Sequence, residues 1–324
     1  MTTKSGKAPS LREKTTWGKA LKRDWHLYLM LLLPVALVII YNYSAYPGLR
    51  MVFMDYKPAK GYSGSKWVGW ETFTKVFRDK DFIRALTNSI IFNLLDLLVS
   101  FPVPIVLALM LNELRFPRFK KVTQTVLYLP HFLSWVIIGS VAYQLFKPST
   151  GIINVLLMKW GWITSPIPFW TNPMLARITI IVVNVWIGIP YMMLIATGLL
   201  MNIPEELYES ARIDGATPFQ MFRSITLPYM LFVTGPFLLT QFTGNLNNFN
   251  VIYLLTKGQP QSMRLTDNAG QTDLLVTWLY KMTVTDTNYK MAAVIGIMVF
   301  LVTAVVSLVV YNMLPSVKDE GGFQ

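Results

Sequence analysis

Long intervals without a charged side chain constrain this chain more than any other feature. Lys, Arg, Asp and Glu are absent between Asp24 and Arg50, Lys121 and Lys147, Arg177 and Glu205, Arg223 and Lys257, and Lys290 and Lys318. Between Arg84 and Glu113 the only charged residue is Asp96. A helix needs about 20 apolar residues to cross a bilayer, and each interval is long enough. Six transmembrane helices are therefore predicted, at 27–48, 87–112, 122–145, 176–201, 226–255 and 291–314.

The composition supports an all-α polytopic membrane protein. Of the 324 residues 53% are hydrophobic and 14% are charged, whereas soluble domains carry about 25% charged residues. The apolar runs do not alternate with period two, as the strands of a membrane barrel would. The chain has no Cys and only two His, His26 and His131, which excludes disulfides, thiolate metal sites and a His-rich metal site.

Flanking charges predict the orientation. The first 25 residues carry seven Lys and Arg, and the ELRFPRFKK loop (113–121) carries four. Because positive loops stay inside, both termini are expected in the cytoplasm. The chain is then divided into a basic N-terminus (1–26), a transmembrane domain (27–315) and a tail (316–324). The domain includes an outside segment, 49–86, whose second half is expected to be an interfacial amphipathic helix. GIINVLLMKWG (151–161) is too short to span.

One cytoplasmic loop, 202–228, is long enough to have a structure of its own. Pro204 suits the first turn of a helix, and Glu205, Glu206 and Glu209 follow where the helix dipole favours acids. Gly215 should break the helix, and the stretch PFQMFRSITL should form a second one that ends at Pro228. The loop therefore predicts two short helices joined at Gly215.

The spacing in this loop resembles the EAA signature of ABC importer permeases. Its matching residues are Glu209, Ser210 in place of the usual Ala, Ala211, Gly215, Ile225, Leu227 and Pro228. The resemblance implies that the loop holds a coupling helix in a cleft of an ATPase subunit. Glu209 would pair with a basic residue there, and Ala211 and Gly215 would allow close approach. An unremarkable amphipathic connector is the alternative.

The likeness covers about 27–315. WVGWETFTKVFRD and FPVPIVLALMLNELRFPRFKKVTQTVLYLPHFLSWV look like permeases of polysaccharide importers of the LplB type, and VNVWIGIPYMM and NLNNFNVIYLLTKG resemble maltose-type permeases. Permeases of alginate importers are also similar. The family implies a type I ABC importer fold in the inner membrane. It also implies a second homologous permease, two ABC ATPase subunits that hold ATP and Mg, and an external solute-binding protein. This chain itself would bind no cofactor or nucleic acid and catalyse no reaction.

Two polar helix faces are candidates for the solute pathway, because polar groups in spans usually face a cavity or another helix. They are Asn184, Gly188 and Tyr191 in the fourth span, and Gln241, Asn245 and Asn248 in the fifth. Amides and an aromatic ring suit a sugar, and the maltose-type resemblance aligns these positions with residues around a sugar site. Where that family has a serine and a phenylalanine, this chain has Gln241 and Gly244. The alternative is interhelical hydrogen bonding and close packing.

Asp96, the one acid in a span, is interpreted as neutralised or helix-pairing, with a proton relay as the alternative, and His131 as a packed, hydrogen-bonded side chain. The outside loops carry fifteen Lys and Arg against seven Asp and Glu. This excess would attract an anionic, uronate-rich oligosaccharide such as alginate fragments, or serve docking to a binding protein.

Other functions remain open at this point. A peptide or phosphate importer would share the EAA loop. A secondary transporter would need inverted repeats and interrupted helices. A membrane enzyme would need a carboxylate pair, a metal set or an activated nucleophile. The chain has no G-x-x-x-x-G-K-[ST] loop, so it is expected to depend on a separate ATPase.

Overall fold

The computed structural model describes residues 22–261 and 269–313. Most of the predicted N-terminal segment and the whole predicted tail lie outside the described residues. The chain divides into two compact units, Met1–Met51 and Val52–Gln324.

The first unit holds one apolar helix, α2 (Trp25–Asn42), in which no residue is buried. The 3-10 helix η1 (Tyr43–Phe53) continues it, and together they are long and apolar enough to cross a membrane. A helix that is apolar all round needs lipid or another protein around it. This agrees with the predicted first span.

Three further long helices match predicted spans. They are α4 (Lys80–Ser100) with α5 (Pro102–Asn112), α9 (Pro173–Met201), and α15 (Tyr289–Met313). Asn172 begins α9 as its N-cap, because its Oδ1 accepts from the backbone N–H groups of Met174 and Leu175 at 2.9 and 3.1 Å. Pro173 at the first helical position has no N–H to satisfy.

The predicted third span, 122–145, is wrong as a continuous helix. The chain forms α6 (Pro117–Tyr128), the 3-10 helix η3 (Leu129–Phe132) and α7 (Trp135–Leu145), with a 104° bend between the two parts. Pro130 lies in the turn and Ser134 caps α7 by accepting from the N–H of Ile137 at 3.4 Å. A proline and a new N-cap so close together end one helix and start another.

The predicted fifth span, 226–255, is also interrupted. It consists of α12 (Leu227–Leu246) and α13 (Phe249–Leu255), separated at Asn248, whose side chain caps α13. A second bend of 56° falls between Pro218–Phe232 and Phe237–Leu246. Four described helices are long and apolar enough to span, or up to six if each bent pair is counted as one span. The prediction of an all-α fold with six spans is confirmed in this sense.

The outside segment is folded locally, with one difference from the prediction. Met54–Asp55 (β1) pairs antiparallel with Lys66–Trp67 (β2), with the 3-10 turn η2 (Pro58–Lys60) between them. The short helix α3 (Glu71–Arg78) follows, and α4 already begins at Lys80. Residues 80–86 therefore belong to a spanning helix and not to an interfacial one. Asp79 causes the restart, because its carboxylate accepts from the N–H of Asp81 at 2.9 Å.

The remaining short helices are α8, α14 and the π-helical turn η5. GIINVLLMKWG forms the short helix α8 (Ile152–Lys159), which agrees with the prediction that this stretch is too short to span a bilayer. Asn154, fully buried, holds this helix to the chain that follows, because its amide donates to the carbonyl of Ile167 and accepts from that residue's N–H. Nearer the C-terminus, α14 (Leu275–Tyr280) runs into η5 (Lys281–Thr285).

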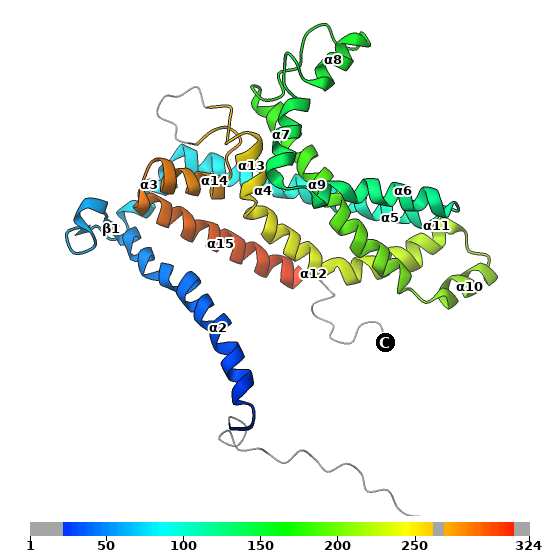
Figure 1. Cartoon of the computed structure of the whole chain (residues 1–324), viewed down its shortest axis with the longest axis horizontal. Helices are drawn as coiled ribbons and strands as arrows, with labels where there is room; N and C mark the ends of the chain where they lie inside the picture. Colours follow the sequence, from blue (N-terminus) through cyan, green and yellow to red (C-terminus); the bar gives the residue numbers. More distant parts are fainter. Residues whose placement is uncertain (1–21, 262–268, 314–324) are drawn as a thin grey trace, which may run out of the picture. The chain divides into compact units, whose positions relative to one another are not determined.

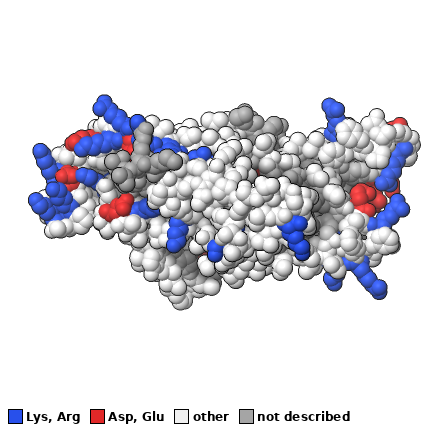
Figure 2. All heavy atoms as spheres, turned by 90° about the horizontal axis from the view of Figure 1, so that it is seen from above, with Lys and Arg blue, Asp and Glu red and all other residues white. Residues whose placement is uncertain are grey.

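The helices of the second unit pack around α9 and the span formed by α4 and α5, which follow one another end to end (Figure 1). Buried apolar clusters join α4 to α14 and α15, α9 to α7 and α13, and α5 to α9 and α12. Figure 2 shows that charged side chains gather at the end with α3 and at the opposite end with α10 (Glu205–Ile213), and that only scattered Lys and Arg lie in the band between them. A protein that spans a bilayer is expected to have such a band.

Candidate functional site

A ladder of buried polar side chains runs along one face of α4. Its members are Ser89, Asn93, Asp96 and Ser100, at positions i, i+4, i+7 and i+11, and none is more than 2% exposed. Each finds a partner in another helix or along α4 itself. Ser89 Oγ accepts from the N–H of Leu275 at 2.9 Å, and Asn93 donates to the carbonyl of Phe242 at 2.7 Å. The polar face of α4 therefore holds the bundle together.

Asp96 is the centre of this network. One carboxylate oxygen accepts a hydrogen bond from Asn184 Nδ2 at 2.7 Å, and the other accepts from Asn245 Nδ2 at 2.6 Å and from Ser100 Oγ at 3.2 Å. Three helices, α4, α9 and α12, thus meet at one carboxylate. Hydrogen bonding of this kind compensates the cost of placing an acid in a span. The interpretation of Asp96 as a helix-pairing acid agrees with this geometry.

Two further amides extend the network. Gln241 Nε2 donates to Ser100 Oγ at 2.5 Å, and Asn248 Nδ2 donates to Asn184 Oδ1 at 3.0 Å. Gln241 Oε1 is buried and has no partner among the described residues. A buried acceptor without a donor is costly, so this oxygen is suited to accept a hydrogen bond from a solute hydroxyl or a water molecule.

A cavity of about 440 Å³ opens beside this network, between α4, η3, α7, α9 and α12. Five of the six predicted pathway residues line it: Asn184, Gly188, Tyr191, Gln241 and Asn245. The sixth, Asn248, does not, since it caps α13 and holds Asn184 in place. Gly244 also lines the cavity, and the space around its Cα is open.

The polar faces contribute both to interhelical packing and to the wall of the cavity. Asn184 and Asn245 make interhelical hydrogen bonds, which is the packing alternative, while their side chains also form part of the cavity wall. Tyr191 is 50% exposed, so its ring remains available as a flat apolar surface. The cavity thus combines amide groups with an aromatic face, an arrangement that can bind a hydroxylated ring.

His131 differs from the expectation of a packed side chain. It is exposed, lines the same cavity, and stacks on Tyr191 with ring centroids 6.1 Å apart and an interplanar angle of 21°. The turn around Pro130 brings it there, because the 104° bend between α6 and α7 directs η3 against α9. Sequence reasoning missed this residue because the bend was not predicted.

Ser100 was also missed, although a signal for it exists. The spacing of Ser89, Asn93, Asp96 and Ser100 is that of one helix face, and four polar residues on one face of an apolar helix predict interhelical contacts. Asp96 considered by itself does not reveal the network.

The cytoplasmic loop forms a separate candidate site. Helix α10 (Glu205–Ile213) has no buried residue. It ends in a Schellman motif, in which the N–H of Ala216 donates to the carbonyl of Ala211 at 2.9 Å and the N–H of Gly215 to that of Arg212 at 3.1 Å. Gly215 has φ +78° with open space around it. This left-handed backbone conformation favours glycine, and among other residues it is best tolerated by asparagine.

The second half of the loop differs from the prediction of a helix ending at Pro228. It consists of α11 (Pro218–Met221), a π-helical turn, η4 (Phe222–Thr226), and then α12 without a break. Thr217 and Gln220 form a capping box that starts α11. The π turn lies directly before Pro228, which has no N–H to donate and is the second residue of α12. The loop is thus rigidly joined to a spanning helix.

Three of the six predicted coupling residues line one depression on this surface, and Glu209, Leu227 and Pro228 do not. Ala211, Gly215 and Ile225 line a shallow cavity of about 390 Å³ between α10 and η4. Glu209 is exposed, Leu227 is half-buried and Pro228 is exposed. Tyr208 and Thr226 join the two sides by a hydroxyl–hydroxyl hydrogen bond of 2.7 Å. Within the described residues, no cluster of His, Asp and Glu is able to hold a metal ion.

Comparison with known proteins places these features in a family. The family described as "Binding-protein-dependent transport system inner membrane component" matches residues 83–319. Protein LplB of Bacillus subtilis (strain 168) is 33% identical over 283 residues, which cover 87% of this chain and 86% of that protein. The maltose/maltodextrin transport system permease protein MalF of Escherichia coli (strain K12) is 35% identical over 263 residues, 79% of this chain but half of that protein's length.

Solved structures agree with the family match. A bacterial ABC transporter involved in the import of the acidic polysaccharide alginate contains a chain with a TM-score of 0.81 and 34% identity, and the match covers 93% of this chain and 99% of that one. A complex of the bacterial alginate ABC transporter with a periplasmic protein holding an alginate pentasaccharide gives a TM-score of 0.80 at 32% identity. The chain therefore belongs to the inner membrane components of binding-protein-dependent transport systems, the permease subunits of ABC importers.

Proposed function

We propose that this chain is the permease subunit through which an ATP-driven importer moves an oligosaccharide from an external solute-binding protein into the cytoplasm. The observation that carries the proposal is the convergence of polar positions from α4, α9 and α12 on one cavity. Relatives that are named as galactooligosaccharide, maltodextrin and alginate transport proteins support a saccharide as the solute.

The chemistry of the cavity favours a saccharide over a peptide or phosphate. No Lys or Arg lines it, and its one charged side chain, Asp96, already accepts three hydrogen bonds. A phosphate would need cationic groups. Amide groups and the stacked rings of Tyr191 and His131 instead suit neutral hydroxyl groups and an apolar sugar face.

A uronate-containing saccharide, such as an alginate fragment, is the finer form of this proposal. It rests on the alginate transporters among the related structures and on the excess of positive charge predicted outside. Since the cavity wall has no Lys or Arg, the carboxylates of such a solute would have to be paired by the second permease subunit.

The loop 202–228 supplies the connection to the motor in this proposal. Helix α10 is exposed and is linked through η4 to α12, which carries Gln241 and Asn245 on the cavity wall. Motion of a docked α10 would therefore reach the solute cavity through one helix. Two ATPase subunits would hold ATP and Mg, and a second homologous permease would complete the pathway. In this arrangement both termini would lie in the cytoplasm.

The test uses the complex that co-purifies with the full chain, reconstituted in vesicles with its binding protein. Glu209→Lys should abolish saccharide-stimulated ATP hydrolysis and uptake while the chain still inserts. Glu113→Lys provides the matched control, because it makes the same charge reversal at an exposed position of the other predicted cytoplasmic loop, outside loop 202–228 and its depression, and it should retain most activity.

The solute is tested in the same vesicles with neutral and uronate-containing oligosaccharides, a peptide and inorganic phosphate. Stimulation of ATP hydrolysis by saccharides alone supports the proposal. Normal coupling in Glu209→Lys would contradict the docking role, and uptake by vesicles that contain this chain without an ATPase would indicate a secondary transporter.

A further inference from the structure

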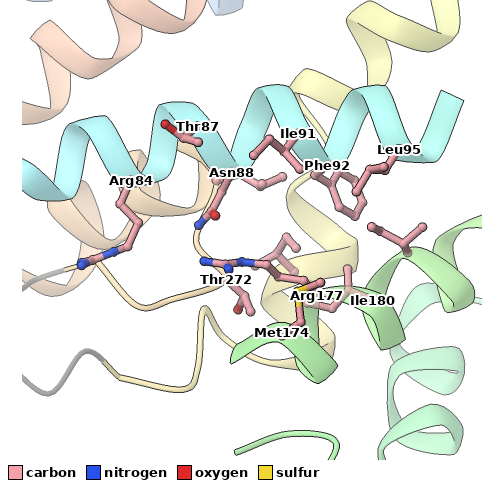
Figure 3. Close-up of a pocket in the computed structure, with 13 residues that line it drawn as sticks. Arg84, Thr87, Asn88, Ile91, Phe92, Leu95, Met174, Arg177, Ile180 and Thr272 are labelled. Atoms are coloured by element: carbon pink, nitrogen blue, oxygen red, sulfur yellow. The ribbon is translucent and has the colours of Figure 1, made fainter. Parts of the chain in front are cut away.

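A second cavity, of about 430 Å³, lies between α4, the first turns of α9 and α13, on the side away from α10 (Figure 3). It is separate from the proposed solute cavity and shares no lining residue with it. Nothing in the proposed transport function uses it.

The lining of this cavity is amphipathic. At one end is the guanidinium group of Arg177, with Asn88 and Thr272 beside it, while the Arg84 side chain extends away from these groups (Figure 3). Apart from Thr87, the rest of the wall is apolar and includes Ile91, Phe92, Leu95, Met174 and Ile180 (Figure 3). Such a wall offers polar partners at its end and only apolar contact along its length.

The two arginines differ in how their charge is compensated. Arg84 forms an ion pair with Asp81 and donates to the carbonyl of Ala269. Arg177 donates to the carbonyl of Gln271 at 2.9 Å, and no carboxylate lies within ion-pair distance of it among the described residues. The Nε of Arg177 is buried and has no hydrogen-bond partner among the described residues. A cation in this position is stabilised by an anionic group.

The depth of the arginines indicates the source of that group. Arg177 is four residues from the start of α9 and Arg84 four from the start of α4, which places both about 6 Å inside the end of a spanning helix. Arginine side chains near helix ends reach toward the membrane interface. The apolar wall runs from there toward the bilayer centre, from Ile91 to Leu95 along α4.

We propose that this cavity binds an anionic phospholipid, with its phosphate at Arg177 and an acyl chain along Ile91 and Leu95. Ile91 and Leu95 are 48% and 43% exposed, so the apolar wall is open to a chain from the bilayer. A saccharide fits poorly because the apolar wall gives its hydroxyl groups no partners. The proposal does not rest on the transported solute, so it stands or falls separately from the proposed function.

The experiment measures lipid retention by native mass spectrometry of the full chain, purified from vesicles of phosphatidylglycerol and phosphatidylcholine mixed in equal amounts. Arg177→Gln should lower phosphatidylglycerol retention about tenfold, because one charge-assisted contact is lost. Lys80→Gln is the matched control, an exposed cation at the start of α4 that is outside the cavity. It should retain lipid as the unaltered chain does.

Ile91→Trp tests the acyl contact, since it fills the apolar wall and leaves both arginines in place. Loss of retention in this variant, with phosphatidylglycerol preferred in the unaltered chain, supports the proposal. Equal retention of both lipids would overturn it. An effect of Arg177→Gln without any effect of Ile91→Trp, with displacement by inorganic phosphate, would show a site for a free anion. Loss of the bound lipid when the second permease is co-expressed would show that a protein side chain occupies the cavity.

Discussion

Replacing Asp96 by leucine tests the polar network directly. Leucine is apolar and accepts no hydrogen bond. The donors of Asn184, Asn245 and Ser100 therefore lose their acceptor in this variant. In water-excluded protein interiors each orphaned donor costs about 1–3 kcal/mol. Interhelical bonds in membranes average about 0.6 kcal/mol and reach about 1.7, because unfolded helices in lipid find other partners.

The membrane values apply here, since α4, α9 and α12 are apolar spans. Two of the three bonds, those from Asn184 and Asn245, join different helices, so their loss should lower the free energy of unfolding by about 1–3 kcal/mol. Asp96→Asn keeps one acceptor oxygen and should fall between the leucine variant and the unaltered chain. Leu98→Ala, which changes a residue of α4 that is 70% exposed, serves as the control and should cost much less.

The assay measures reversible unfolding of the purified chain in lipid bicelles by steric trapping. The three variants are compared at equal protein and lipid concentration, and the order of stability is the readout. If Asp96→Leu is as stable as the unaltered chain, the carboxylate costs as much as its hydrogen bonds contribute. The reasoning that this network holds three helices together would then be refuted.

Three other substitutions have defined outcomes. Gly215→Ala should lower the free energy of unfolding by about 1 kcal/mol, because φ is +78°, and should weaken the coupling of ATP hydrolysis to uptake. Gly215→Asn should retain the coupling. Equal coupling in both variants would show that the conformation of the turn does not affect coupling. Gly244→Phe should narrow the solute cavity and lower uptake of long saccharides more than short ones in a vesicle assay, and unchanged uptake would place the pathway elsewhere. Lys290 forms an ion pair with Asp55 of β1, and its hydrogen bond and charge lower the pKa of Asp55. The stabilisation by this pair is therefore complete above the ordinary Asp pKa of about 3.9 and is lost as the pH falls through the lowered pKa. The protection factors of the hairpin amides, which are corrected for the intrinsic pH dependence of exchange, should therefore fall in acid. Asp55→Asn should remove that pH dependence, and a fall in protection that persists in the variant would contradict the reasoning.

The spans can be predicted from the sequence because a bilayer requires long uncharged helices. Each such helix is visible in the sequence as an interval with no charged residue or, in one interval, a single one. The breaks within spans are harder to predict. Pro130 and Asn248 lie in apolar runs in which a span can absorb a local bend. Only the packing of η3 and α13 on α9 shows that the chain turns there.

The candidate cavity could be predicted in part. The faces of α9 and α12 follow from helical periodicity, and five of the six residues do line one cavity. Their common partner does not follow, since Asp96 is 88 residues from Asn184 and 149 from Asn245. The spacing of polar residues marks the face of α4 that makes interhelical contacts, but it does not specify which helices meet that face. The role of Gly215 likewise follows from a backbone angle that the sequence only suggests.

The central claim is that α10 docks on an ATPase subunit in the cytoplasm. Because the chain contains no Cys, Ile213→Cys introduces one reactive group on α10, at a position that is 87% exposed. Crosslinking from this cysteine in intact cells should join the chain to the ATPase subunit, and a membrane-impermeant maleimide added outside should not label it. Labelling from outside, with no crosslink to an ATPase, would contradict the account.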